Sequence, residues 1–341
     1  MTRMTDRNAW RLAAGAAAVT FAIAGFAPAT ATAQKFTMKF GTATFNDTQH
    51  NYIKMYKEAV EKASKGRIEV SIHPRSELGP IPRMIDGLQL GTIEAYIGPA
   101  DFYVGVDPRF GVFSTPMLFR DNAQATKTVH DASINGFILD MGAPKGILGL
   151  GTYASGASNY AAKTPLLRLS DFSGKKLRVN ATAMEREKMR RLGATAVPLP
   201  LNEVLPSLQR GVIDGTMSGT AIFVAFKMND AVKTITITND THLVAYAAVS
   251  KVWLDKLPAD LQKIVRDVGR EVQVKNAVWE AEFNALQGKA WEKLGGTIHM
   301  LPPEDLKKMA QLLNSVGDDV SKDQPGVIDM LKRMRAVVAK Y

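Results

Sequence analysis

Apolar and polar residues alternate along three short segments in the first third of the chain. This period of two predicts β-strands over 36–43, 67–73 and 92–99. Between them, apolar residues recur at helical spacing over 49–64 and again after Pro80, through Met84 and Leu88 to Leu90. A strand-helix-strand-helix-strand order is typical of a parallel sheet covered by helices. The pattern therefore predicts an α/β lobe.

Ligands bind α/β sheets outside the carboxyl ends of their strands. Thr44 and Phe45 follow the first predicted strand, and Pro99 ends the third. These three residues are therefore candidate ligand contacts.

The middle of the chain repeats the same kind of unit. Short strands are predicted over 176–179 and 195–198, each followed by a helix, and Val212–Gly215 returns to the sheet. The apolar, glycine-rich segment 145–153 lacks the spacing of a nucleotide-binding loop, so we interpret it as a strand that crosses between lobes. A second α/β lobe follows from this pattern.

One helical pattern is much longer than the others. After Pro258, apolar residues recur at helical spacing as far as Trp291. A helix of about 30 residues spans roughly 45 Å, which is more than the width of one small lobe. We expect this helix to lie across both lobes. A short strand over 297–301 and helices over 303–320 and 327–338 complete the chain.

The N-terminus has the layout of a signal peptide. Arg3, Arg7 and Arg11 precede an apolar run over 12–29, and the small residues up to Ala33 fit a cleavage site. The alternative is a membrane anchor, for which the run is short and rich in Ala and Gly. We predict cleavage of residues 1–33 and a mature protein with no stable membrane insertion.

Composition excludes several classes of chemistry. The 341 residues include no Cys, which excludes disulfides, thiolate metal sites and Cys nucleophiles. The five His are far apart without metal-ligand spacing, and the G-x-S-x-G motif of serine hydrolases is absent. The acidic pairs Glu185/Glu187 and Asp318/Asp319 are expected on solvated helix faces. The sequence thus predicts no catalysis, no metal and no cofactor.

The formal net charge of +10 raises nucleic acid as a partner. The first 33 residues carry three Arg and one Asp, so their removal lowers the charge to +8. The remaining Lys and Arg are spread along helices and mixed with acidic residues, which argues against a nucleic-acid surface. A basic exported protein that attracts anionic solutes is the preferred interpretation.

Arg178 is the lead candidate for binding chemistry. It lies on a short apolar strand that should be half buried, and a guanidinium there needs an anionic partner. A ligand carboxylate would supply that partner. Spacing alone leaves a structural ion pair with Asp214 or Glu203 as the alternative.

Several motifs stand in an order that resembles the solute-binding proteins of tripartite ATP-independent periplasmic (TRAP) transporters, of the dicarboxylate-binding DctP type. The motifs are Pro74-x-Ser76-x-Leu78-Gly79, Leu88-Gln89-Leu90-Gly91, Pro116-Met-Leu-Phe119-Arg120, Leu177-Arg178-Val179, Leu208-Gln209-x-Gly211-Val212-x-Asp214-Gly215 and Trp253-x-x-x-Leu257-Pro258. The resemblance covers nearly the whole chain after the leader.

The resemblance implies a two-lobe periplasmic binding protein of the type II-like class, whose lobes are joined by crossing strands and the long helix. It implies that the lobes close on an organic acid, that Arg178 pairs with its carboxylate, and that small and large membrane subunits receive the ligand. Asn180, two residues after Arg178, is a further candidate ligand contact. We assign 34–155 plus 244–283 to lobe I and 156–243 plus 284–341 to lobe II. The alternatives are a periplasmic enzyme that acts on an organic acid and a ligand-sensing partner of a membrane receptor.

This chain departs from the family pattern at three positions. Ser158 stands where many members have a second arginine, Ser218 stands where they have an asparagine, and Arg83 replaces an acidic residue. Fewer polar contacts to the ligand favour a monocarboxylate, which can be aromatic. The aromatic residues near strand ends and crossing segments are candidates to hold such a ring or to fill the core: Phe45, Phe102, Tyr103, Tyr153 and Phe223. Whether Arg83 faces the ligand stays open.

Overall fold

The structure is a computed structural model that describes residues 34–180 and 182–341. Lys35–Tyr341 form one compact unit, which is described below. The predicted signal peptide, 1–33, lies outside the described residues. No helix in the described ranges is long and apolar enough to span a membrane.

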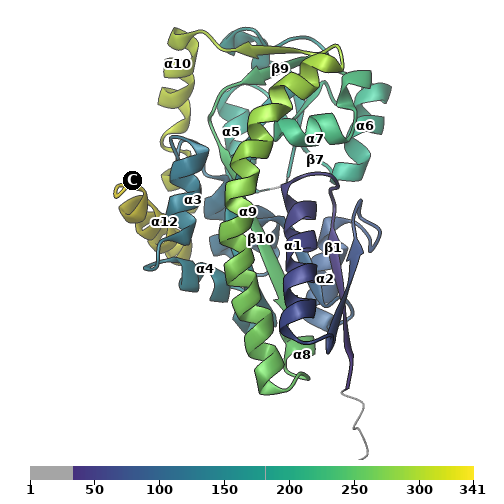
Figure 1. Ribbon diagram of the computed structural model, residues 1–341. Coiled ribbons are helices and arrows are strands. Elements are labelled where there is room, and N and C mark those ends of the chain that lie inside the picture. The colour runs from purple at the N-terminus through teal and green to yellow at the C-terminus, as the bar shows by residue number, and fades with distance from the viewer. Residues whose placement is uncertain (1–33, 181) are drawn as a thin grey trace, which may run out of the picture. The chain divides into compact units, whose positions relative to one another are not determined.

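Five strands form the first sheet, in the spatial order β2-β1-β3-β10-β4. Their bounds are β1 Phe36–Thr42, β2 Ile68–His73, β3 Ala95–Pro99, β4 Ile147–Ala157 and β10 His242–Ser250. Strand β1 pairs in parallel with β2 and β3, whereas β10 is antiparallel to β3 and β4. Helices α1 (Thr48–Ala63) and α2 (Ile81–Leu90) connect the parallel strands, which confirms the predicted β-α-β-α-β unit (Figure 1).

Six short strands form the second sheet, in the order β11-β9-β5-β8-β6-β7. Their bounds are β5 Asn159–Ala162, β6 Lys176–Val179, β7 Thr195–Pro198, β8 Gly215–Ser218, β9 Thr234–Ile237 and β11 Thr297–Met300. Strand β6 is parallel to β7 and β8. The helices that follow these three strands are α5 (Ala183–Arg191), α6 (Leu201–Arg210) and α7 (Thr220–Ala225). The carboxyl ends of β6 and β8 therefore lie at one edge of the sheet.

The chain crosses between the two sheets at two neighbouring places. Ser158 is the single residue between β4 and β5, and 238–241 connect β9 to β10. The backbone N–H of Ser158 donates to the carbonyl oxygen of Thr241 at 2.8 Å, so the two crossings are hydrogen-bonded. Strand β4 extends beyond the predicted segment 145–153 and includes residues 154–157.

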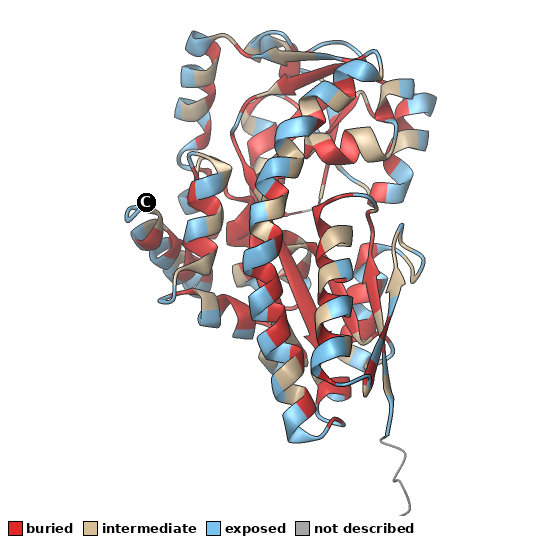
Figure 2. Cartoon of the chain, in the orientation of Figure 1, coloured by how far each residue is buried: buried red, intermediate tan, exposed pale blue. Residues whose placement is uncertain are grey.

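Helix α9, Ala259–Lys293, has 35 residues and is about 52 Å long at 1.5 Å per residue. At its N-terminal half, the hydroxyl groups of Tyr52 and Tyr56 on α1 donate to the carbonyl oxygens of Gly269 and Val265. Near its other end, the buried Trp291 donates through its indole N–H to the carbonyl oxygen of Lys233, beside β9. Figure 1 shows α9 running from the end near α8 to the end near β9, and Figure 2 shows buried and exposed residues alternating along it. The predicted helix across both lobes is confirmed.

Gly269→Ala should destabilise the protein by about 1–3 kcal/mol, the usual cost of overpacking. A Cβ at Gly269 would lie 2.4 Å from the carbonyl oxygen of Leu150 on β4, and backbone cannot move aside easily. Urea unfolding measures the effect. Gly288→Ala on the same helix is the control, because its Cβ would meet only a terminal methyl of Ile298 at 3.2 Å. Equal stability of the two variants would contradict tight packing of α9 on β4.

Helical spacing predicts one helix over 122–141 and another over 303–320, and the structure divides each of them in two. The first is divided into α3, Asn122–His130, and α4, Asn135–Asp140, and the second into α10, Pro303–Leu313, and α11, Val316–Ser321. The Asp131 carboxylate accepts the backbone N–H of Ser133 at 2.9 Å, which favours a turn over a continued helix. The short α8 and the last helix have the bounds α8 Lys251–Leu254 and α12 Pro325–Val338.

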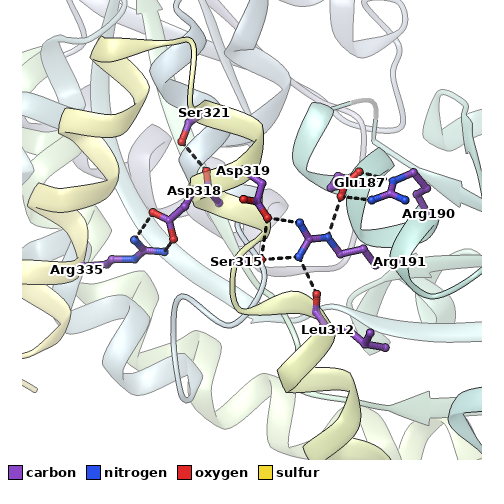
Figure 3. A network of polar contacts seen from close by, with 10 residues as sticks. Glu187, Arg190, Arg191, Leu312, Ser315, Asp318, Asp319, Ser321 and Arg335 are labelled. Atoms are coloured by element: carbon purple, nitrogen blue, oxygen red, sulfur yellow. Dashed lines mark hydrogen bonds and ion pairs between the residues drawn. The ribbon is translucent and has the colours of Figure 1, made fainter.

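An arginine-centred network attaches the C-terminal helices to α5 (Figure 3). The Arg191 guanidinium donates to Glu187 at 2.8 Å, to the carbonyl oxygen of Leu312 at 2.8 Å and to the Ser315 hydroxyl at 2.7 Å. Its remaining nitrogen forms an ion pair with Asp319. Arg191 thus joins the turn between α10 and α11 to the second sheet.

The acidic residues of this region differ in their environments. Asp318 and Asp319 are partly exposed and pair with arginines. The prediction that Glu185 lies on a solvated face is wrong, because its side chain is fully buried. Glu185 occupies the third position of α5, and its carboxylate accepts the backbone N–H of Thr182 at 3.2 Å in a capping box.

Candidate functional site

A cavity of about 50 Å³ lies between residues that follow the strand ends of both sheets. The first sheet and its helices contribute Ala43, Thr44, Asp47, Thr48, Gln49, Ile81, Pro99 and Phe102. The second sheet contributes Arg178, Asn180, Leu201, Met217, Ser218, Gly219, Ala221 and Ile222, and the crossing strands contribute Ser155, Ser158 and Leu243. The cavity is therefore built from both lobes and from the segments that join them.

Six of the nine residues predicted to contact the ligand line this cavity: Thr44, Pro99, Ser158, Arg178, Asn180 and Ser218. They come from four strand ends and one crossing, as the rule for α/β sheets leads one to expect. Phe45, Tyr153 and Phe223 are not among the lining residues.

Among the described residues that line the cavity, Arg178 is the only one with a cationic side chain. It lies on β6 and is 2% exposed, with its Nε donating to the carbonyl oxygen of Leu199 at 2.9 Å. Burial lowers its pKa to about 10, against the opposing effect of the Glu185 and Asp101 carboxyls, so the side chain stays charged at neutral pH. Within the described part of the chain, Arg178 forms no ion pair with a carboxylate.

The two alternative partners of Arg178 are engaged elsewhere or lie apart from it. Asp214 accepts the backbone N–H of Lys176 at 2.8 Å. Glu203 is in the first turn of α6 and has an exposed side chain. A structural ion pair with either residue therefore does not account for the buried guanidinium, which is available for an anion.

Two hydroxyl groups lie near the crossing. Ser158 is fully buried, and its Oγ has no hydrogen-bond partner among the residues that the structure describes. Ser218, at the end of β8, pairs with Asn159 across the sheet and lines the same cavity. Buried hydroxyl groups are normally hydrogen-bonded, so the Ser158 Oγ is suited to a ligand oxygen.

Sequence reasoning missed two buried carboxyl groups at the site. Asp47 caps α1 by accepting the backbone N–H of His50 at 3.0 Å, and burial raises its pKa to about 6. Asp101 follows β3 and accepts a hydrogen bond from Asn180 at 3.1 Å. Burial, and then the Glu185 carboxyl, raise the pKa of Asp101 to about 7. Both residues lie close after strand ends, so the rule that predicted Thr44 and Pro99 could also have indicated them.

The other predicted aromatic contacts have different surroundings. The Phe45 ring packs against Phe226 at 5.2 Å and under the Arg75 guanidinium at 3.4 Å, outside the cavity. Tyr153 is fully buried in the core of the first lobe. Phe223 is equally buried and packs against Trp291.

Of the remaining residues considered from the sequence, Phe102 lines the cavity, whereas Tyr103 is in the core. Arg83 is exposed on α2 and is not among the lining residues. In the described ranges, no group of three or more His, Cys, Asp or Glu is placed to hold a metal ion.

The model of the family "bacterial extracellular solute-binding protein, family 7" (DctP) matches residues 40–323. The chain belongs to this family. The match includes the whole cavity lining and every strand of the two sheets except the first four residues of β1. The cavity is therefore the candidate solute site of a solute-binding protein.

Two similar proteins are named as periplasmic binding proteins. The C4-dicarboxylate-binding periplasmic protein DctP of Rhodobacter capsulatus is 29% identical over 301 residues, which cover 86% of this chain and 88% of that protein. The 2,3-diketo-L-gulonate-binding periplasmic protein YiaO of Escherichia coli K12 is 26% identical over 320 residues, or 92% and 95% of the two chains.

Solved structures confirm the two-lobe α/β fold. A TRAP periplasmic solute-binding protein from Desulfovibrio salexigens, with bound orotic acid, gives a TM-score of 0.84 at 22% identity and covers 90% of this chain and 99% of its own. A second TRAP periplasmic solute-binding protein, from Shewanella oneidensis with bound succinate, gives a TM-score of 0.83 at 24% identity. It covers 89% of this chain and 99% of its own.

Proposed function

We propose that this solute-binding protein captures an organic acid by pairing its carboxylate with Arg178. The observation that carries the proposal is a buried, charged guanidinium that lines the cavity. The Glu185 and Asp101 carboxyls attract it, but neither forms a close ion pair with it in the described ranges. An arginine can form two parallel hydrogen bonds with a carboxylate, which gives orientation as well as affinity. Asn180, Ser158 and Ser218 offer further polar groups at the same site.

The charge of the lining favours an acid with one carboxylate. Arg178 is its cationic residue, and the Asp47 and Asp101 carboxyls lie at or beside the cavity. A second ligand carboxylate would meet acidic groups and no second cation, and burying an unpaired charge is costly. This supports a monocarboxylate.

The apolar part of the lining favours a ligand with an apolar body. Its residues are Ala43, Ile81, Pro99, Phe102, Leu201, Met217, Ala221, Ile222 and Leu243. A cavity needs about 10–15 Å³ of such space for one water, so about 50 Å³ suits a small aliphatic acid. An aromatic acid would require the lobes to move apart. The Desulfovibrio salexigens protein holds orotic acid, a ring-bearing monocarboxylate, and supports testing that class.

We further propose that the protein works in the periplasm and delivers its ligand to the membrane subunits of a TRAP transporter. The periplasmic relatives and the TRAP solute-binding structures support both parts. Closure of two lobes around a ligand is a common switching motion and would be the event that those subunits detect.

A thermal-shift screen followed by calorimetric titration tests the ligand class. The panel contains aliphatic monocarboxylates such as pyruvate, aromatic ones such as orotate, sugar acids, and dicarboxylates such as succinate. We expect a singly charged acid to bind most tightly. Tight binding restricted to dicarboxylates would contradict the monocarboxylate assignment, and no binding across the panel would contradict capture of an organic acid.

A further inference from the structure

We propose that Asp101 takes up a proton when the site binds a ligand carboxylate, so that one proton enters the protein with each singly charged acid. This inference rests on the proposed function of the cavity. In this inference Asp101 positions Asn180 through a hydrogen bond. By changing its protonation state, it also adjusts the net charge of the site when the ligand binds.

The geometry places Asp101 where the two lobes meet. It follows β3 of the first sheet, whereas Asn180 follows β6 of the second sheet, and the hydrogen bond between them is 3.1 Å long. Asp101 is 4% exposed, and its Oδ1 is buried without a hydrogen-bond partner among the described residues. A buried carboxylate with so few donors is poorly stabilised in its charged form.

The charged groups around Asp101 come from several elements. Arg178 on β6 favours the ionised carboxylate, and Glu185 on α5 opposes it. Burial raises the pKa of Tyr96 on β3, and the nearby Asp101 charge adds to that effect. Asp47, before α1, lines the cavity beside these groups.

Other charged groups on the elements packed against the Asp101 turn are paired, exposed or linked elsewhere. Arg109, on the neighbouring turn, pairs with Asp107. Arg83 and Asp86 on α2 are exposed. On β10, the Tyr246 hydroxyl donates to the carbonyl oxygen of Leu139, and the pKa of His242 is lowered by burial, with opposing effects of Asp240 and Asp121.

The ligand adds a negative charge to this set. In the free protein, Arg178 is the cation that faces the Asp101 and Glu185 carboxyls, and the pKa of Asp101 is about 7. A ligand carboxylate at Arg178 repels a charged Asp101. It also neutralises the Arg178 charge that favours ionisation of Asp101, so the pKa of Asp101 rises on binding. Between the two pKa values, the ligand enters together with a proton.

The sign of the pH dependence follows directly. Below about pH 6, Asp101 is already protonated in the free protein, so Asp101 contributes no pH dependence of affinity there. Above about pH 7, binding requires a proton from solution, and affinity should fall by up to tenfold per pH unit. An acid whose own carboxyl titrates well below pH 5 keeps the ligand charge constant over this range.

Calorimetry with the whole chain tests the inference, with pyruvate and orotate as probes. Titration at pH 8 in two buffers of different ionisation enthalpy gives the number of protons taken up per ligand. We expect close to one proton at pH 8 and close to none at pH 5.5. A count of zero at both pH values, with binding intact, would overturn the role of Asp101 and leave the proposed function standing. Failure of both probes and the whole panel to bind would overturn both.

Variants identify the carboxyl that takes up the proton. Asp101→Asn should bind acids but lose the proton uptake and the fall in affinity above pH 7. Glu280→Gln is the matched control, because Glu280 is also buried, has its pKa raised to about 7 by burial, and does not line the cavity. Its uptake should be unchanged. Loss of uptake in Asp47→Asn with uptake retained in Asp101→Asn would overturn the assignment, and the proton count of the unmodified chain stands even if Asp101→Asn does not fold.

Discussion

Arg178→Ala should weaken binding of a singly charged acid by about 2–5 kcal/mol, which corresponds to roughly 30- to 5000-fold in affinity. The guanidinium is buried, so its pairing with a carboxylate is shielded from water, and its loss leaves the ligand charge in a cavity without another cationic residue in its lining. Calorimetric titration at pH 6 measures the loss, because Asp101 is then mostly protonated.

Two further variants make this prediction specific. Lys176→Ala removes a cation from the exposed first residue of the same strand and should leave affinity unchanged. Arg178→Lys keeps the charge but not the planar pair of donors, so its affinity should lie between those of the other two. Unchanged affinity in a folded Arg178→Ala variant would reject Arg178 as the carboxylate-binding residue.

Lys188→Met should destabilise the protein by about 3–5 kcal/mol, the usual cost of removing one partner of a buried ion pair. Lys188 on α5 and Asp240, in the crossing between β9 and β10, are both fully buried, with Nζ 3.2 Å from Oδ2. Without the lysine, Asp240 would keep hydrogen bonds from Tyr160 at 2.9 Å and Thr238 at 3.1 Å, but its charge would have no counterion.

Chemical unfolding at pH 7 measures this effect, with two comparisons. Lys263→Met breaks the exposed pair of Lys263 with Asp267 on α9 and should cost less than about 1 kcal/mol. The double variant Lys188→Met/Asp240→Asn should regain much of the lost stability, because no unpaired charge stays buried. If Lys188→Met were as stable as the Lys263→Met control, the expected cost of breaking the buried Lys188–Asp240 ion pair would be contradicted.

The sequence predicted the order of strands and helices because apolar residues repeat every two residues in strands and about every 3.6 residues in helices. It could not predict the break near Asp131, where apolar spacing continues but a side chain competes for the backbone N–H of Ser133. It also placed Glu185 on the surface, because a charged residue in a helix is usually solvated, and the capping interaction with Thr182 depends on the helix start.

At the candidate site, the rule of strand ends and the family resemblance together indicated Arg178 and five other lining residues. Aromatic residues were misleading because a sequence does not show which side of a strand faces the core. Tyr153 ends the strand predicted over 145–153, but it lies in the middle of β4, and its ring stacks on Tyr52 of α1 at 6.1 Å. Asp47 and Asp101 escaped notice because carboxyls are not expected where an anion binds.

Helix α9 constrains any motion of the lobes. It is held at Gly269 by Tyr52 of the first lobe and at Trp291 by the backbone beside β9. Between these points, Glu280 accepts hydrogen bonds from Asn122 on α3 at 2.9 Å. If the lobes rotate about the crossings at Ser158 and Thr241, α9 must bend between Gly269 and Trp291, because these two residues are attached to different lobes. A long helix can bend gently, and bending α9 would resist further opening of the lobes. The helix would therefore limit the angle through which the lobes open.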